Sequence, residues 1–495
     1  MQVKSLWTKD FKFKKIKRLK ENIVVDILII GGGITGLTTA YYLKDKKKNI
    51  CLVDQGIVGM GVSSRTTGKI NYLQETIYSD LEKMYSFDVA KKYYDSQKLA
   101  IRELKRIIWE ERIKCDFTRV DSYVFTKDKD EVKKLKYEKE ILEKLGAKIY
   151  DSTKVGNGVS AKYAIYVKDT YVFHPLKYLD ALKNICNDCG VDIYEKTRIR
   201  KMEKCKDGYL CQTDSCTIKA KKVILACHYP YFLKPYFFPL KVYNEKSYVT
   251  ASIVKSIRKE TFITSTLPCK SVRYHKDDKN YFIYLGNSHK ICNSFNEKDN
   301  FSNLLNELDK IGLKPTYIWS NEDVMTIDKI PYIGKLEKDN NNLFIGTGYN
   351  TWGMSNGTLA GLILSDFVLG KDNEYKDLFS PLRINCLENI DGYLSNIGGT
   401  LKSFVGNKIK KNKYWYGDKV SFEVRNGKSV AIYNDGTKEH IVLSNCPHLG
   451  CTLLFNEVEK TWDCPCHASR FNLDGKCIKG PSNYDISYIE DEEEI

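Results

Sequence analysis

VVDILIIGGGITGLTTAYYLKDKKKNICLVDQG, residues 24–56, is the stretch that decides the fold of the first part of this chain. It begins with a run of apolar residues, continues through three glycines into a helical pattern, and ends in a second apolar run before Asp54. Short apolar runs bounded by turn residues are typical of buried strands, and the middle segment has the spacing of a helix. The stretch therefore predicts a strand, a helix and a second strand parallel to the first.

The glycines of this unit predict a dinucleotide site. Gly31, Gly33 and Gly36 follow the first strand and open the helix, where a pyrophosphate can approach the backbone at the helix N-terminus. Asp54 ends the second strand, where its carboxylate can accept a hydrogen bond from a ribose hydroxyl. The motif by itself does not distinguish NAD from FAD.

The size and composition of the chain indicate a globular protein with two or more units. It has 495 residues, of which 42% are apolar and 29% are charged, and single cores stop growing well below this length. No run of about eighteen apolar residues occurs, so we expect no integral membrane segment. The basic N-terminus leads into the first strand without a small-residue cleavage site, so we expect a cytoplasmic protein.

The net charge of +16 comes mainly from lysines spread along the whole chain. No cluster of Lys and Arg alternates with stacking aromatic residues as single-strand binders require, so we expect no nucleic-acid partner. A lysine-coated, solvated surface is the simpler interpretation. The segment from Lys9 to Lys20 leaves a second one open, contact with anionic lipid or with an acidic electron carrier.

The rest of the chain divides by pattern. Residues 79–113 and 129–146 carry apolar residues at helical spacing, and residues 241–321 alternate polar and apolar positions as in an antiparallel sheet with one covered face. Residues 328–370 predict a strand, a glycine-rich turn and a helix. Residues 389–411 mix glycine with basic and short apolar groups, which is typical of a linker. The remaining residues predict a small all-β domain, because short strands alternate there with Asn-Gly and Asp-Gly turns.

Five of the sixteen cysteines crowd into the last part of the chain. Cys446-Pro-His448 and Cys464-Pro-Cys-His467 place a thiol and an imidazole in each of two short segments. Two Cys and two His in this pattern can hold a 2Fe-2S cluster, with thiolates on one iron and imidazoles on the other. Zinc sites with Cys and His usually present Cys-x-x-Cys or His-x3-5-His pairs, which disfavours zinc here. The predicted metal ligands are therefore Cys446, His448, Cys464 and His467.

The same segments resemble the two cluster loops of Rieske proteins. CPHLGC at residues 446–451 and CPCHASRF at residues 464–471 match these loops, and GPS at residues 480–482 resembles the proline loop of that family. In the high-potential branch of the family, one further cysteine in each loop forms a disulfide that braces the two loops. The resemblance implies such a disulfide between Cys451 and Cys466.

As far as about Pro381, the chain resembles the D-amino-acid oxidase and glycine oxidase family of flavoproteins. The matching pieces are GGGITGLTTAYYL, GVSSRTTGKI, ILACHYP and IGTGYNTWGMSNG. The resemblance implies that the cofactor is FAD and that the last of these pieces closes over the flavin ring. It also implies cofactor-binding roles for Arg65, Thr66, Thr67, Gly346, Gly348, Trp352, Gly353 and Met354. For Trp352, plain core packing is an equal alternative.

Together, the patterns and the resemblances predict an α/β fold, a Rossmann-like FAD-binding domain with an antiparallel-sheet substrate lobe, followed by a small all-β Rieske domain. This order of parts resembles a group of bacterial FAD-dependent oxidoreductases. The expected boundaries are 1–388 for the FAD-dependent part, 389–412 for the linker and 413–495 for the Rieske domain. Within the first part, we expect FAD-binding segments at about 22–80, 150–235 and 322–385, and a substrate lobe at about 81–149 and 236–321.

The resemblance implies flavin-dependent oxidation of a small amine or amino acid, with electrons passed from FAD to the 2Fe-2S cluster and on to an unidentified acceptor. A flavin takes up two electrons together, whereas the cluster passes one at a time, and these cofactors supply the redox chemistry. The protein must then hold a neutral amine and any carboxylate of the substrate. Candidate residues in the alternating segment are Tyr248, Arg273, Tyr284 and His289, although each is more commonly a structural residue of a sheet.

Two alternatives stay open. One is an oxidase that forms hydrogen peroxide, in which the Rieske domain is only structural. The other is an electron-transfer module, in which a pyridine nucleotide reduces the flavin for a partner oxygenase. The sequence has no second GxGxxG motif that would bind this nucleotide, which counts against the module.

Overall fold

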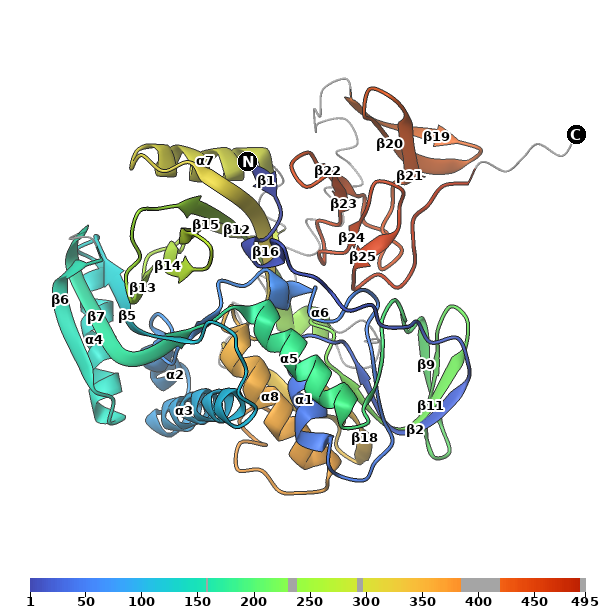
Figure 1. The fold of residues 1–495 in the computed structure, drawn as a ribbon, viewed down its shortest axis with the longest axis horizontal. Coiled ribbons are helices and arrows are strands. Elements are labelled where there is room, and N and C mark those ends of the chain that lie inside the picture. Colours follow the sequence, from blue (N-terminus) through green and yellow to red (C-terminus); the bar gives the residue numbers. More distant parts are fainter. Residues whose placement is uncertain (157–158, 230–237, 292–296, 384–418, 490–495) are drawn as a thin grey trace, which may run out of the picture.

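The computed structural model describes residues 1–156, 159–229, 238–291, 297–383 and 419–489. These residues form two large sheets with helices packed against them, and a separate group of small sheets built from the C-terminal residues (Figure 1). In Figure 1 the C-terminal strands, coloured orange to red, lie at the upper right of the molecule. The fold class expected from the sequence is confirmed.

The first large sheet contains the predicted strand-helix-strand unit. Its strands follow the order β17-β18-β11-β2-β3-β8, and β10 and β9 extend it from β11. β2 pairs in parallel with both β3 and β11, as the central strand of an α/β sheet does. The bounds are β2 Ile23–Ile30, β3 Ile50–Val53, β8 Asp192–Tyr194, β9 Lys201–Cys205, β10 Gly208–Gln212, β11 Thr217–Leu225, β17 Tyr332–Glu337 and β18 Asn340–Thr347.

Both faces of β2 are buried, which explains its nearly continuous apolar sequence. Ile27 and Ile29 point into a core shared with three helices that cover one face of the sheet, whereas Leu28 and Ile30 point into a second core on the opposite face. The three helices are α1 Ile34–Leu43, α5 Pro175–Asp188 and α8 Gly353–Val368. α1 packs against both α5 and α8.

The second large sheet is the expected lobe of alternating strands. Its strands follow the order β1-β16-β12-β15-β14-β13-β5-β7-β4, and β6 pairs with β7. The bounds are β1 Gln2–Val3, β4 Lys69–Ile70, β5 Thr118–Thr126, β6 Ile149–Val155, β7 Val159–Val172, β12 Val242–Ile253, β13 Glu260–Thr264, β14 Ser271–Lys276, β15 Asn280–Lys290 and β16 Pro315–Thr326. The remaining helices are α2 Ile77–Met84, α3 Phe87–Glu110, α4 Glu131–Lys144, α6 Phe238–Lys241 and α7 Glu297–Asp309, with 3-10 turns at Leu6–Thr8 and Val62–Ser64.

Two segments lie in a different layer from the expected one. Residues 69–70, within the expected FAD-binding segment 22–80, form β4 of the second sheet. Residues 150–172 were assigned to the FAD-binding part, but they form β6 and β7 of the second sheet. β7 pairs with β5 along most of its length, and β6 pairs with β7 in turn. The choice of sheet depends on these long-range partners, and a strand pattern in the sequence does not identify them.

The C-terminal residues form two small antiparallel sheets around one core. β19 Val420–Arg425, β20 Lys428–Asn434 and β21 Glu439–Leu443 make the first, and β22 Leu454–Asn456, β23 Thr461–Asp463, β24 Arg470–Phe471 and β25 Cys477–Lys479 make the second. Asn426 and Gly427 both have positive φ, 47° and 72°, and join β19 to β20 in the tight hairpin that the Asn-Gly pair predicts. The expected linker, residues 389–412, lies outside the described residues.

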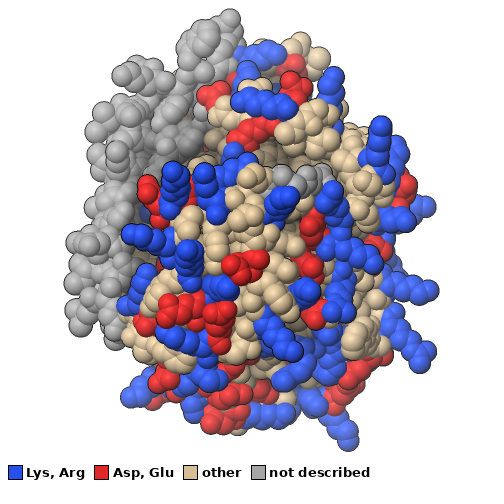
Figure 2. All heavy atoms as spheres, turned by 90° about the vertical axis from the view of Figure 1, so that its left-hand side faces the viewer, with Lys and Arg blue, Asp and Glu red and all other residues tan. Residues whose placement is uncertain are grey.

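No helix among the described residues is long and apolar enough to cross a membrane. Figure 2 shows the face that lies on the left in Figure 1. Lys and Arg are spread over this face with Asp and Glu between them, rather than gathered in one basic patch. This face therefore gives no sign of the basic groove that a nucleic-acid backbone requires.

Candidate functional site

The glycine turn between β2 and α1 is shaped by close backbone contacts. Gly31 has φ of +111°, and a Cβ at this position would lie 2.4 Å from the carbonyl oxygen of Ala226 in the neighbouring strand end. A Cβ at Gly36 would lie 1.9 Å from the oxygen of Gly31. Gly33 precedes the first residue of α1, whose backbone N–H groups face the turn. These positions require glycine, and they leave the helix N-terminus open to an anionic group.

Asp54 is held beside this turn by two backbone groups. Its carboxylate accepts hydrogen bonds from the N–H groups of Gly32, at 2.8 Å, and of Gly56, at 2.7 Å. Burial raises the pKa of Asp54, and the two N–H groups oppose this increase. The carboxylate retains acceptor capacity, because a carboxylate accepts about four hydrogen bonds.

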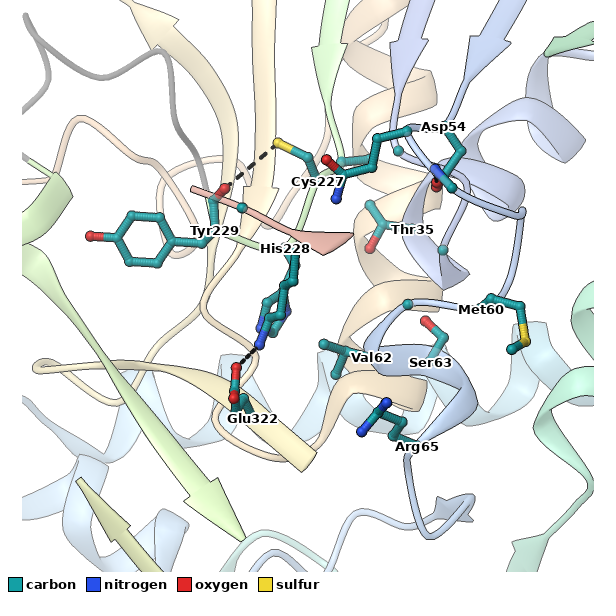
Figure 3. Close-up of a pocket in the computed structure, with 18 of the residues that line it drawn as sticks. Thr35, Asp54, Met60, Val62, Ser63, Arg65, Cys227, His228, Tyr229 and Glu322 are labelled. Atoms are coloured by element: carbon teal, nitrogen blue, oxygen red, sulfur yellow. Dashed lines mark hydrogen bonds and ion pairs between the residues drawn. The ribbon is translucent and has the colours of Figure 1, made fainter. Parts of the chain in front are cut away.

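A cavity of about 570 Å³ lies over the glycine turn, and we call it the cofactor cavity. Figure 3 shows Thr35, Ser63 and Arg65 on one side of it and His228 and Tyr229 on the other. Eight of the predicted cofactor residues line it: Gly31, Gly33, Asp54, Arg65, Thr66, Gly346, Gly353 and Met354. The fold thus brings predicted cofactor residues from four separate segments of the chain to one cavity.

The other four predicted cofactor residues lie beside this cavity. Gly36 and Gly348 shape the backbone without lining it; Gly348 has φ of +75°, and its added Cβ would lie 2.4 Å from a methyl group of Thr326. Thr67 and Trp352 line a neighbouring cavity. Contact of the last two residues with the cofactor stays a prediction.

Two residues of the cofactor cavity were not singled out from the sequence, although both belong to the quoted ILACHYP segment. The His228 ring hydrogen-bonds the main chain of Glu322, as Figure 3 shows, and burial lowers its pKa to about 3, so the ring is neutral. Among the described residues, His228 Nε2 and the Tyr229 hydroxyl have no hydrogen-bond partner although they are buried. Buried polar atoms without partners fit a site that a polar cofactor completes.

The second cavity, of about 540 Å³, adjoins the cofactor cavity and lies against the ten-stranded sheet. β12, β15 and β16 supply much of its wall. The residues that line both cavities are Thr66, Asn321, Asp323, Thr351, Gly353 and Met354. A molecule in the second cavity therefore adjoins whatever occupies the first, as a substrate adjoins its cofactor.

None of the four predicted catalytic residues is among the residues that line the second cavity. Arg273 donates from Nη1 to the carbonyl oxygens of Thr67, Gly68 and Phe173, and is fully buried behind the wall. The Tyr284 hydroxyl donates to Glu307 of α7 at 2.6 Å. These two side chains connect parts of the lobe to one another, which is the structural role that is common for such residues in a sheet.

Tyr248 and His289 lie on the opposite face of the sheet from the second cavity. The Tyr248 hydroxyl and His289 Nε2 are 3.1 Å apart, and the Tyr248 ring packs edge-on against Phe301 of α7. Their strand neighbours Ser247 and Ser288 line the cavity instead. Alternation along a strand separates two faces, but it does not tell which face is hollow.

The four predicted metal ligands lie together at the tips of two loops. Cys446 and Cys464 are nearly fully buried, and their thiols hydrogen-bond each other. The His448 and His467 rings lie 5.0 Å apart between centroids. Burial lowers the pKa of His448 to about 4 and of His467 to about 3, so both imidazoles are neutral, as metal ligands must be.

Polar groups around the two loops favour a thiolate and leave imidazole nitrogens free. Hydrogen bonds from the Cys464 thiol, from backbone N–H groups of the first loop and from the Ser469 hydroxyl lower the pKa of Cys446. His448 Nδ1 and His467 Nε2 are buried without a partner among the described residues. Two thiols and two neutral imidazoles with unpartnered nitrogens fit a mixed Cys and His iron-sulfur site.

Cys451 and Cys466 form the disulfide that the resemblance implied. It joins the two ligand loops, and the Cys464 sulfur lies within 4.8 Å of both disulfide sulfurs. Behind the loops, the Ser482 backbone N–H donates to the Ser469 hydroxyl at 2.9 Å, so the expected proline loop, residues 480–482, packs against the second ligand loop.

The C-terminal strands form part of the wall of the cofactor cavity. The residues that they contribute are Arg470, Asn472, Lys476, Cys477, Ile478, Lys479 and Gly480. Tyr229, which lines the same cavity, has its ring centroid 6.0 Å from that of the predicted ligand His467. One residue thus contacts both predicted cofactor sites.

Buried charges hold the C-terminal strands in this position. Lys246 of β12 lies 3.1 Å from Asp463 of β23 and also pairs with Glu297 of α7. Arg65 pairs with Glu459 at 2.9 Å, and Lys479 pairs with Glu322. Within the C-terminal region, Arg470 bridges Glu459 and Asp463.

Two family models match the chain, a model described as FAD dependent oxidoreductase over residues 26–367 and one described as Rieske [2Fe-2S] domain over residues 408–489. The protein YhfW of Bacillus subtilis (strain 168), whose name describes a Rieske 2Fe-2S iron-sulfur protein, is 30% identical over 493 residues, 98% of this chain and 97% of that protein. Gamma-glutamylputrescine oxidoreductase of Escherichia coli (strain K12) is 23% identical, over 75% of this chain and 89% of that protein. Glycine oxidase from Geobacillus kaustophilus shares the fold, with a TM-score of 0.62 at 18% identity, over 73% of this chain and 99% of that structure.

Proposed function

Because the chain belongs to the family of FAD-dependent oxidoreductases and carries a C-terminal Rieske [2Fe-2S] domain, we propose that it oxidises a small amine or amino acid and passes the electrons from FAD through the cluster to an acceptor. The family establishes the enzyme class and both cofactors. The substrate, the electron path and the acceptor belong to the proposal.

In this proposal, different residues of the cofactor cavity bind different parts of the FAD molecule. Gly31 and Gly33 admit the pyrophosphate to the N-terminus of α1, and Asp54 accepts from the ribose. Arg65 and Thr66 line the same cavity and would contact the ribityl chain that joins the pyrophosphate to the ring. Gly346 lines the cofactor cavity, and Thr351, Gly353 and Met354 form a part of its wall that also borders the second cavity. FAD supplies hydride uptake from the substrate, and the protein supplies position and environment.

For the cluster, Cys446 and Cys464 supply the thiolates, and His448 and His467 supply the imidazoles. The disulfide between Cys451 and Cys466 keeps the two ligand loops in register. We place the domain boundaries at 1–388, 389–412 and 413–495, as expected from the sequence. A cytoplasmic location also stays a prediction of the sequence.

The observation that carries the proposal is the shared wall between the two cofactor sites. Residues of the Rieske domain line the cofactor cavity, and Tyr229 lies between this cavity and the His467 ring. A Rieske domain with a purely structural role would not need to approach the flavin site. This arrangement favours transfer through the cluster over the hydrogen-peroxide-forming oxidase, and the lack of a second dinucleotide motif disfavours the electron-transfer module.

The test is anaerobic stopped-flow mixing of the holoprotein with amines and amino acids, monitored at flavin and cluster wavelengths. We expect flavin absorbance to bleach first and cluster absorbance to follow at the same substrate concentration. A cluster that stays oxidised while the flavin is reduced would contradict internal transfer. Stoichiometric hydrogen peroxide under air would favour the oxidase, and bleaching by NADH would favour the module.

A further inference from the structure

Four carboxylates line the second cavity. One of them, Asp80, pairs with Lys329, and the other three come from parts of the chain that are distant in sequence. Glu75 lies in the loop before α2, Glu245 lies on β12, and Asp323 lies on β16. Each side chain is only partly buried, as expected for groups that face a cavity. We call these three residues the carboxylate group of the second cavity.

Two members of the carboxylate group face each other across neighbouring strands. Glu245 and Asp323 are direct partners in the antiparallel pairing of β12 with β16, and side chains at such positions have Cβ atoms about 4.5–5.5 Å apart. Like charges directly opposite each other destabilise a sheet. None of the three carboxylates forms an ion pair with a Lys, Arg or His of the described residues. Lys290 stands opposite Glu245 on β15, so a cation is near, but the described residues provide no ion pair to any of the three.

The pKa values reflect this arrangement. Burial and the charge of Glu245 raise the pKa of Glu75 to about 7, and the same two causes raise that of Asp323 to about 7. Burial also raises the pKa of Glu245. A cation placed among the three would reverse these shifts, because an opposite charge favours the ionised form.

The lysines that line the second cavity interact with groups other than the three carboxylates. Lys329 pairs with Asp80 at 2.6 Å. Lys69 donates to the Ser271 hydroxyl at 2.6 Å and to a backbone oxygen, and burial lowers its pKa to about 7. Lys290 extends over the Tyr243 ring. No arginine is among the described residues that line this cavity, so it lacks the bidentate group that best holds a substrate carboxylate.

Two further polar atoms point to a ligand independently of the charges. The hydroxyl oxygen of Ser247 and the side-chain oxygen of Asn321 are buried without a hydrogen-bond partner in the part of the chain that the structure describes. The two residues are only 6% and 5% exposed, and both line the second cavity. Unsatisfied buried acceptors are costly, and a ligand with N–H groups would satisfy them.

We propose that the second cavity takes a diamine or polyamine, a substrate with two or more cationic nitrogens and no carboxylate, held by Glu75, Glu245 and Asp323. The inference rests on the proposed amine oxidation and names its substrate class. Asn321 and Asp323 border both cavities, so a nitrogen held there lies next to the cofactor cavity. Glu245 lies beside Asp323 on the neighbouring strand and shares this nitrogen, and Glu75, from the loop before α2, holds the cationic nitrogen at the other end.

Three ligands of equal chain length test the inference on the unmodified holoprotein. They are 1,6-diaminohexane, 1-aminohexane and 6-aminohexanoate, titrated calorimetrically after the flavin and the cluster have been reduced with dithionite, so that no turnover occurs. We expect the diamine to bind about tenfold more tightly than either of the others, because only it offers each end a charge-assisted hydrogen bond. Equal affinities, or tightest binding of 6-aminohexanoate, would overturn the inference.

Variants locate the binding site. Glu245→Gln and Asp323→Asn should each weaken diamine binding by about tenfold and leave 6-aminohexanoate nearly unchanged. Glu203→Gln, at an exposed acid of β9, is the control and should change neither. Retained diamine affinity in both cavity variants would place the ligand elsewhere and refute the site.

The binding assay also separates this inference from the proposed function. A diamine that binds in the cavity but never bleaches the oxidised flavin would leave the inference standing and refute amine oxidation of this substrate. If amines bleach the flavin but the protein shows no preference for two cationic nitrogens, the proposed amine oxidation stands and the inference about the substrate class is refuted. Flavin content and the cluster signal of each variant show whether it has folded.

Discussion

Individual titratable side chains determine the charge of the second cavity at neutral pH. Glu75 and Asp323 have pKa values raised to about 7, and Lys69 has a pKa lowered to about 7, in each case mainly through burial. A rise in pH removes a proton from all three groups. The cavity therefore becomes more negative over the range in which an aliphatic amine, with a pKa of about 10.4, stays cationic.

This charge change predicts a pH dependence of diamine binding. Between pH 6 and pH 8.5, ionisation of Glu75 and Asp323 and neutralisation of Lys69 should all favour a cation, so the dissociation constant of 1,6-diaminohexane should fall by about tenfold. Calorimetric titration of the reduced holoprotein at the two pH values measures this. The Asp323→Asn variant should show a smaller dependence. Binding that weakens toward alkaline pH would be inconsistent with these assignments.

At the scale of elements, the glycine turn and the helix that follows it form one unit with little steric freedom. The backbone of Gly31 passes against Ala226 at the end of β11, and Gly36 in the first turns of α1 packs directly on the oxygen of Gly31. The sequence motif anticipated these contacts, because they depend on the local strand-turn-helix geometry. Only glycine allows the helix N-terminus to approach a pyrophosphate so closely.

A methyl group at this position should displace the turn. In Gly36→Ala, the added Cβ would meet the Gly31 oxygen at 1.9 Å, so the turn or the helix must shift. An overpacked position of this kind costs about 1–3 kcal/mol, and we expect FAD affinity to fall by about tenfold or more. The flavin-to-protein absorbance ratio after purification measures the loss. The cluster signal serves as an internal control for folding, and a full complement of FAD would argue against this role of the turn.

The ten-stranded sheet shows which part of the site the sequence left undetermined. β12 turns Glu245 and Ser247 toward the second cavity and Lys246 and Tyr248 toward α7 and the C-terminal strands. The alternating pattern predicted a strand with two distinct faces. Both faces are buried against protein, however, so polarity could not identify the one that lines a cavity, and the predicted catalytic residues came from positions outside it.

At the scale of the whole molecule, the Rieske domain is fastened to the flavin domain by buried charges. Lys246 is 4% exposed and lies among Glu297, Glu322 and Asp463, which belong to α7, β16 and β23. Burial alone would raise the pKa of Asp463, but Arg470 and Lys246 lower it well below its usual range. Such a network is costly to break: Glu322 also pairs with Lys479 and Asp463 with Arg470, but removal of Lys246 leaves Glu297 buried without the cation it pairs with.

Two lysine variants distinguish buried from exposed pairs across the same interface. Lys246→Met should lower the free energy of unfolding by about 3–5 kcal/mol, since three buried carboxylates lose their shared cation. Lys298→Met is the matched control; Lys298 pairs with Glu457 at 3.4 Å, is 69% exposed, and should cost less than about 1 kcal/mol. Denaturant titration followed by flavin fluorescence and cluster absorbance measures both. Similar small losses would mean that this network does not hold the domains together.

The sequence by itself determined the features whose residues are close together in the chain. The glycine turn with Asp54 beside it, the two loops that carry the predicted cluster ligands and the order of the domains could be read directly, because strand-turn-helix geometry and metal-ligand spacing are local. The tertiary structure decided everything that depends on contacts between distant segments: that residues 150–172 belong to the second sheet, that Tyr229 lies against His467, and that Glu75, Glu245 and Asp323 share a cavity. Strand pairing and domain packing create these neighbourhoods, and no local pattern records which partner a strand or a carboxylate will meet.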